Sequence, residues 1–227
     1  DNECNNDDFM PKLGGGKFTL SDKAAVYTDM MFFASRGIHA ANPAANTVMG
    51  GIVGNNCEAF MEYVYENIEA PDSWSKYPDD YFQIACWHPY IHTNYTDEKF
   101  RAFNQGIYDV ILKHEGKDKK VFCSEMGWSQ ANVTAEQVAE WLPRAYAVAR
   151  ELGFIESIHY FRLYDVWSSD WGSPAEKQFG LFTDPLSHGP TIDGVSKNPI
   201  LGAPKASALA YQAMAGGSGS LELLVRA

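Results

Sequence analysis

The sequence predicts an α/β protein made of about four βα units with parallel strands, which is half of a TIM (β/α)8 barrel. Short apolar runs alternate along the chain with stretches whose apolar residues recur at helical spacing. Strands that alternate with amphipathic helices imply right-handed crossovers and a sheet covered by helices. A closed barrel takes roughly 250 residues, about 30 for each unit, so four units with loops make half a barrel.

The first two strands and their helices are expected before residue 90. A helix is predicted from Ser21, its N-cap, to about His39, and the apolar and small residues 47–53 predict the strand that follows. Residues 57–68 predict the second helix, and residues 81–87 predict the next strand.

A third helix is expected from Asp97, which serves as its cap, to about His114. One apolar stripe along it consists of Phe100, Phe103, Ile107, Val110 and Ile111. Gly116 is expected to end this helix.

The last units follow a short buried strand that ends at about Glu125. Thr134-x-x-Gln137 has the spacing of a capping box and predicts a helix to about Leu152, offset at Pro143. A strand over 155–163, a long loop over 165–203 and a helix over 204–215 with Pro204 in its first turn complete the prediction. The half barrel is therefore expected to span residues 1–215. Residues 216–227 read as a linker, an appended tail or the start of a further domain.

The amino-acid composition argues against some classes of binding partner. A net charge of -11 and the lack of a basic run argue against nucleic acid. No apolar stretch approaches the roughly 18 residues that span a bilayer, so a soluble protein without a membrane partner is expected. The four cysteines lack C-x-x-C spacing and read as core residues. The cellular location stays open, because an export signal is either absent from the natural protein or removed from this chain.

The clearest chemical signal is Glu125, followed by Gly127 and Trp128. In parallel barrels the C-terminal ends of the strands carry the chemistry, because their loops converge on one pocket. The ring of Trp128 would suit the apolar face of a sugar. The alternative is a solvated glutamate that closes a strand.

His88 and His92 are four residues apart, a spacing that could bind zinc if both lay on a helix. Pro89 between them favours a strand that exits into a loop, and no Glu follows His88 as in H-E-x-x-H. No metal and no cofactor is therefore expected, and taken alone His88 is a strand-end histidine with satisfied hydrogen bonds.

Three segments together resemble a known enzyme family: Asp1-Asn2-Glu3, Trp87-His88-Pro89-Tyr90 and Ser124-Glu125-Met126-Gly127-Trp128. They are similar, in the same order, to motifs in the C-terminal half of the clan-A (β/α)8 glycoside hydrolases, near family thirty-nine. Further similar segments are Ala41-Asn42-Pro43, Gly50-Gly51, Phe179-Gly180-Leu181 and Pro204-Lys205. The resemblance extends from Asn2 to about Ala215.

This resemblance implies a retaining hydrolase with two glutamates that acts on β-linked plant-type glycans or β-glycosides. Glu125 is then similar to the nucleophile and Glu3 to the general acid/base, with Asn2 on the 2-hydroxyl of the sugar. Residues expected to bind substrate or support Glu125 are His88, Tyr90, Trp128, Trp167 and Trp171. The last two are either platforms for sugar rings or anchors that pin the loop to the barrel rim. Glu3 lies near the start of the sequence, where we expect a poorly ordered segment.

Two other classes of function are also compatible with the sequence. One is a noncatalytic half-barrel assembly that keeps the acids but forms no pocket. The other is a different barrel enzyme, such as an aldolase or a phosphate-ester enzyme, which the lack of a Gly-rich phosphate loop disfavours. In every case a half barrel exposes two sheet edges and one apolar face, so we expect a homo-oligomer, either a dimer or a tetramer. The inward side chains expected to face water are Val48, Ile52, Ile84, Cys86 and Phe122.

Overall fold

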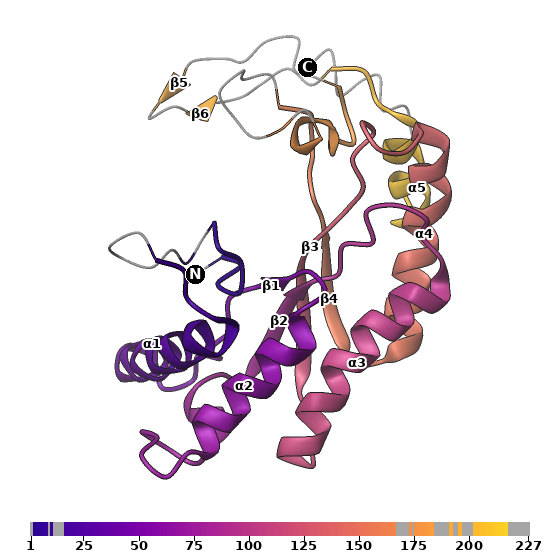
Figure 1. Ribbon diagram of the computed structural model, residues 1–227. Coiled ribbons are helices and arrows are strands. Elements are labelled where there is room, and N and C mark those ends of the chain that lie inside the picture. Colours follow the sequence, from indigo (N-terminus) through magenta and orange to yellow (C-terminus); the bar gives the residue numbers. More distant parts are fainter. Residues whose placement is uncertain are drawn as a thin grey trace. The chain divides into compact units, whose positions relative to one another are not determined.

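The structure is a computed structural model that describes residues 2–8, 10, 16–166, 173, 175–183, 191–192, 195–196 and 202–217. Its central sheet has the order β1-β2-β3-β4, in which parallel pairing joins β1 to β2 and β2 to β3. These strands are Ile52–Val53, Ile84–His88, Lys120–Met126 and Ile155–Tyr160. Helices α2, α3 and α4 connect them in turn, as predicted for a half barrel (Figure 1).

The helices are α1 (Leu20–Ala41), α2 (Cys57–Glu69), α3 (Asp97–Glu115), α4 (Ala135–Leu152) and α5 (Ala206–Met214). Two short 3₁₀ helices cover Pro78–Asp80 and Glu176–Gln178, and a small antiparallel pair joins β5 (Thr191–Ile192) to β6 (Val195–Ser196). None of the helices in the described part of the chain is long and apolar enough to cross a membrane.

The chain divides into two compact units. The first consists of Asp1–Tyr90, Arg101–Glu125 and Ala149–His159, and the second of Ile91–Phe100, Met126–Val148 and Tyr160–Ala227. The predicted boundary between a half barrel over 1–215 and a tail over 216–227 stays a prediction.

Two helix starts show how local hydrogen bonds fix the boundaries. The capping box at Thr134 is confirmed, because Gln137 N donates to its hydroxyl at 3.2 Å and Thr134 N donates to Gln137 Oε1 at 2.8 Å. The predicted cap Ser21 is wrong. Thr19 caps α1 instead, since its hydroxyl accepts from the backbone N–H of Asp22 and its own N–H donates to the Asp22 carboxylate. The prediction missed a box that starts two residues earlier.

The predicted strand over 47–53 is shorter in the structure. Only Ile52 and Val53 pair as β1, while Val48 makes an isolated bridge to β2. The backbone of Gly50 and Gly51 forms hydrogen bonds outside the sheet. Gly50 N donates to the Tyr27 hydroxyl at 2.5 Å, and Gly51 O accepts from Glu3 N at 2.7 Å. This turn of the backbone places Glu3 next to the sheet.

Two later boundaries also differ from the prediction. β2 begins at Ile84 rather than residue 81, because the N–H groups of Tyr81 and Phe82 both donate to Pro78 O in the preceding 3₁₀ turn. Pro204 is not in the first turn of α5. It forms an antiparallel bridge with Phe182, so the helix starts two residues later, at Ala206.

Strand β2 lies at the centre of the core, and all five of its residues are buried. Trp87 donates from Nε1 to Asn104 on α3 at 2.8 Å, which holds the helix against one face of the sheet. Successive side chains in a strand alternate between faces, so Cys86 and His88 point to the opposite face. All four cysteines are buried and unpaired, as expected, and burial raises the pKa of Cys4 to about 12.

The exposed inner face is smaller than the sequence suggested. Ile52, Ile84 and Cys86 are buried by the chain itself, so the expectation that they face water is wrong. Val48 is exposed and Phe122 is half-buried. Ile52 joins the main core cluster, and the Cys86 thiol lies 3.1 Å from Ser124 Oγ.

Self-association stays a prediction for which the exposed side chain of Val48 is a remaining reason. We expect a dimer or tetramer at micromolar concentration, because exposed apolar side chains favour burial against another copy. Sedimentation equilibrium measures this mass directly. One folded species with the mass of the monomer would show that the chain covers its own edges.

Candidate active site

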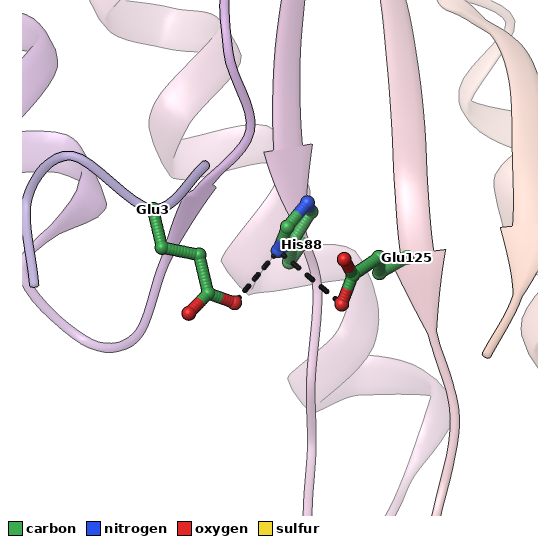
Figure 2. A group of neighbouring side chains, drawn as sticks. All are labelled: Glu3, His88 and Glu125. Atoms are coloured by element: carbon green, nitrogen blue, oxygen red, sulfur yellow. Dashed lines mark hydrogen bonds and ion pairs between the residues drawn. The ribbon is translucent and has the colours of Figure 1, made fainter. Parts of the chain in front are cut away.

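His88 stands at the centre of the candidate site, at the C-terminal end of β2. Its side chain is only 1% exposed, and each ring nitrogen has a partner. Nε2 lies 3.0 Å from the hydroxyl of Ser124, while Nδ1 lies 2.9 Å from Oε1 of Glu3 and 3.8 Å from Oε2 of Glu125. Figure 2 shows the two carboxylates reaching the same ring nitrogen from opposite sides. The imidazole therefore links two acids that are far apart in the sequence.

Glu125 lies next to the last residue of β3, where the sequence predicted a functional acid. Its side chain is 26% exposed. The hydroxyl of Tyr90 donates to its Oε2 at 2.8 Å, so the expected contact with Tyr90 is confirmed. Such a bond fixes the direction in which the carboxylate points. We also expected Glu125 to lie in the largest polar cleft, yet two cavities of about 580 Å³ in the described chain are lined by other residues.

Glu3 is held more firmly than its position in the sequence suggested. Its N–H donates to Gly51 O, and the following side chain, Cys4, is fully buried. The Asn5 amide then bonds to both backbone groups of Val53 in β1, at 3.0 Å and 2.6 Å. These contacts hold Glu3 and the two residues after it against β1, while the expected poor order of this segment stays a prediction.

The separation of the two acids is the main chemical feature of the site. One carboxylate oxygen of Glu3, one of Glu125 and a ring nitrogen of His88 all lie within 4.8 Å of one another. Carboxyl groups about 5–5.5 Å apart suit a covalent two-step displacement, whereas about 6.5–9.5 Å leaves room for a water between substrate and base. The nearest oxygens of the two acids, which lie within 4.8 Å, are compatible with the shorter separation. The arrangement can therefore place one carboxylate at a reacting carbon while the other serves the leaving oxygen.

Asn2 and Trp128, two of the other residues predicted to bind substrate, make no described contact with the two acids. Asn2 is exposed, and among the described contacts no hydrogen bond joins its amide to the two acids. Trp128 is only 1% exposed: its Nε1 donates to Ile91 O at 2.7 Å, and its ring packs edge-on against Tyr95. A ring buried in this way has a packing role and offers no open face to a sugar, contrary to expectation. Trp167 and Trp171 lie outside the described residues.

Sequence reasoning missed Ser124 and Gly51. A signal for Ser124 was present, because Cys86 pairs with Phe122 and two further residues bring His88 opposite Ser124 on the same face. Gly51 lies so close to His88 that an added Cβ would overlap the imidazole ring. The sequence showed this glycine only as part of a strand.

Gly51→Ala tests how tightly the site is packed. We expect the methyl group to push the His88 ring away from Glu3 and to reduce any activity of the site at least about tenfold, since a misplacement of about 1 Å can cost 100-fold. The matched control is Gly37→Ala on α1, where an added Cβ meets nothing within 4 Å. That change should leave activity intact and slightly stabilise the helix. Equal activity in both variants would show that the contact with His88 is unimportant.

Three solved structures share this fold, each at low sequence identity. The first is a family 39 glycoside hydrolase from Bacteroides cellulosilyticus, with 18% identity and a TM-score of 0.56 over 84% of this chain and 36% of that one. The second is a family 128 endo-β-1,3-glucanase from Amycolatopsis mediterranei, with 12% identity and a TM-score of 0.50 over 82% and 65%. A β-glucosidase matches with 14% identity and a TM-score of 0.50 over 91% and 55%.

The chain thus spans between about a third and two thirds of the length of these proteins. No protein-family model and no curated protein sequence matches it. The resemblance predicted from the residue motifs is confirmed for the fold, because the similar structures are glycoside hydrolases. The chain has the fold of half a (β/α)8 barrel of the type found in glycoside hydrolases.

Proposed function

We propose that this chain acts as a retaining glycoside hydrolase on β-linked sugars. The observation that carries the proposal is the pair of glutamates beside His88. One carboxylate oxygen of each glutamate and a ring nitrogen of His88 all lie within 4.8 Å of one another. His88 and Glu125 stand at the C-terminal ends of β2 and β3, where barrel enzymes carry out their chemistry. The similar fold of known glycoside hydrolases supports the same reading.

In the first step, the carboxylate of Glu125 attacks the anomeric carbon, and the bond from that carbon to the leaving oxygen breaks. The carboxylic acid of Glu3 gives its proton to this oxygen. The product is an alcohol and a glycosyl ester on Glu125. In the second step, Glu3 takes a proton from water, whose oxygen attacks the anomeric carbon and releases Glu125. Each step inverts the anomeric centre, so the two together retain it.

Two neighbours assist Glu125. Tyr90 donates a hydrogen bond to the carboxylate oxygen, which holds the carboxylate in one direction. The His88 ring separates the two acids and bonds to Glu3, while Ser124 fixes the far side of the ring. His88 is therefore proposed as a positioning residue, and Asn2, Trp167 and Trp171 remain proposed contacts of the sugar.

Aryl β-glucosides are the first substrates to test, because two of the similar structures are named as an endo-β-1,3-glucanase and a β-glucosidase. Release of the phenol would be followed by absorbance, and the first-formed sugar anomer by proton NMR before mutarotation. We expect hydrolysis with the β-anomer formed first. The α-anomer as first product would overturn the two-step mechanism, and no hydrolysis of any β-glycoside would favour the noncatalytic half barrel.

A further inference from the structure

We propose that Glu3, His88 and Glu125 form a binding site for a first-row divalent cation of the zinc type. One nitrogen and two carboxylate oxygens converge within 4.8 Å of one another. Zinc binds such atoms at about 2.0–2.2 Å, so two tetrahedral ligands of one ion stand about 3.4 Å apart. The distances from Nδ1 to the two oxygens, 2.9 Å and 3.8 Å, lie on either side of that value.

The surroundings of His88 also suit a metal ligand. A histidine that binds a metal through one ring nitrogen usually donates its other N–H to a nearby acceptor, which fixes the tautomer. Nε2 lies 3.0 Å from Ser124 Oγ, and that oxygen lies 3.1 Å from the thiol of Cys86. Nε2–H can thus donate to Ser124, whose own proton turns to Cys86. The Nδ1 lone pair is then free to face the cation between the carboxylates.

The charges of the two carboxylates also favour a divalent cation at this site. In the part of the chain that the structure describes, Glu3 and Glu125 each form an ion pair with His88 and with no other residue. Two carboxylates that face one another across a buried ring repel unless a positive charge lies between them. A divalent cation supplies that charge and is reached from the solvent side, because the side chains of Glu3 and Glu125 are 13% and 26% exposed. The cluster differs from the His88 and His92 pair, which the loop at Pro89 disfavours.

Binding here would compete with glycoside turnover, a consequence that rests on the proposed function. The cation engages both carboxylates and leaves neither free to attack carbon or to carry a proton. Zinc should therefore inhibit hydrolysis, and a chelator should restore it. The binding site itself does not depend on turnover.

Calorimetric titration with Zn²⁺ alone tests the site, with the visible spectrum of bound Co²⁺ as a second readout. Wild type should bind one ion, and Glu125→Gln and Glu3→Gln should each weaken binding at least tenfold, because an amide lacks the charge. Ser124→Ala alters an exposed hydroxyl and should weaken binding about tenfold through His88. The control is His159→Gln, an exposed histidine on β4.

Unchanged binding in His159→Gln together with weaker binding in the three site variants would support the proposal. No binding by wild type, or equal binding in Glu125→Gln and wild type, would overturn it. An active enzyme that takes up no Zn²⁺ removes the cation site and keeps the proposed function. An inactive chain that binds Zn²⁺ through these residues keeps the site and removes the function.

Discussion

Glu125→Gln is expected to lower kcat on aryl β-glycosides by on the order of 10⁴-fold or more, the scale seen when a nucleophile is removed from other covalent enzymes. The amide has the size of the carboxylate and still accepts the hydrogen bond from Tyr90, but it cannot form the glycosyl ester. Folding should be unaffected, since the side chain is partly exposed. Rates with an activated aryl glycoside and the far-ultraviolet circular dichroism spectrum check both statements.

Rescue chemistry separates a lost nucleophile from a damaged site. Glu125→Gly leaves space in which azide can attack the anomeric carbon, and the product should be a glycosyl azide of inverted configuration. The matched control is Glu156→Gln on β4, which removes an exposed carboxylate paired with Lys120 and should leave kcat unchanged. Wild-type rates in Glu125→Gln would exclude this residue from the mechanism.

Lys119 and Glu115 form a second group of charges, at the opposite end of the strands. Their side chains are 2% and 1% exposed, and Lys119 Nζ lies 3.0 Å from Glu115 Oε1. Nζ also bonds to Phe82 O at 2.8 Å, and the hydroxyl of Tyr65 donates to Glu115 Oε1 at 2.6 Å. Buried charges are tolerated only when they are paired and hydrogen-bonded. The pair therefore ties the end of α3 to the start of β3.

Lys119→Met should lower the free energy of unfolding by about 3–5 kcal/mol, because it removes the nearer of the two lysines that pair with the buried carboxylate of Glu115. Urea denaturation monitored by tryptophan fluorescence measures the loss. Lys120→Met is the matched control, since the adjacent lysine is 66% exposed and its ion pair with Glu156 is worth about 1 kcal/mol or less.

The double variant Lys119→Met with Glu115→Gln tests the cause. If the loss comes from an unpaired buried charge, removal of both charges should restore a large part of the stability. A double variant as unstable as the sum of the two single variants would show that packing, rather than charge, accounts for the effect.

Local patterns predicted much of the fold. Three features that depend on residues close together in the sequence were predicted, and the structure has all of them. They are the apolar stripe of α3, the capping box at Thr134 and the glycine at position 116, just after α3. The short strand that ends near Glu125 was also predictable, because a run of apolar residues followed by an acid is a local signal in the sequence. The contact of Tyr90 with Glu125 was expected from the resemblance to the glycoside hydrolases.

Other features depend on contacts between distant residues. The anchoring of Glu3 comes from Gly51 and Asn5, and the shortened β1 comes from the Tyr27 hydroxyl, none of which a local pattern shows. Trp128 looked like a sugar platform because its neighbours in sequence are functional, yet Tyr95, over 30 residues away in sequence, packs against it. The buried pair of Lys119 and Glu115 gave no signal, since charged residues usually lie on the surface.

Trapping of the covalent intermediate tests the central claim most directly. A β-glucoside with a good leaving group and fluorine next to the anomeric carbon slows both steps, and the second step more, so the glycosyl-enzyme accumulates. Mass spectrometry of the digested protein should then find one added fluorosugar, attached to Glu125. A label on another residue, or turnover of this substrate with no label at any time, would contradict the role of Glu125 as nucleophile.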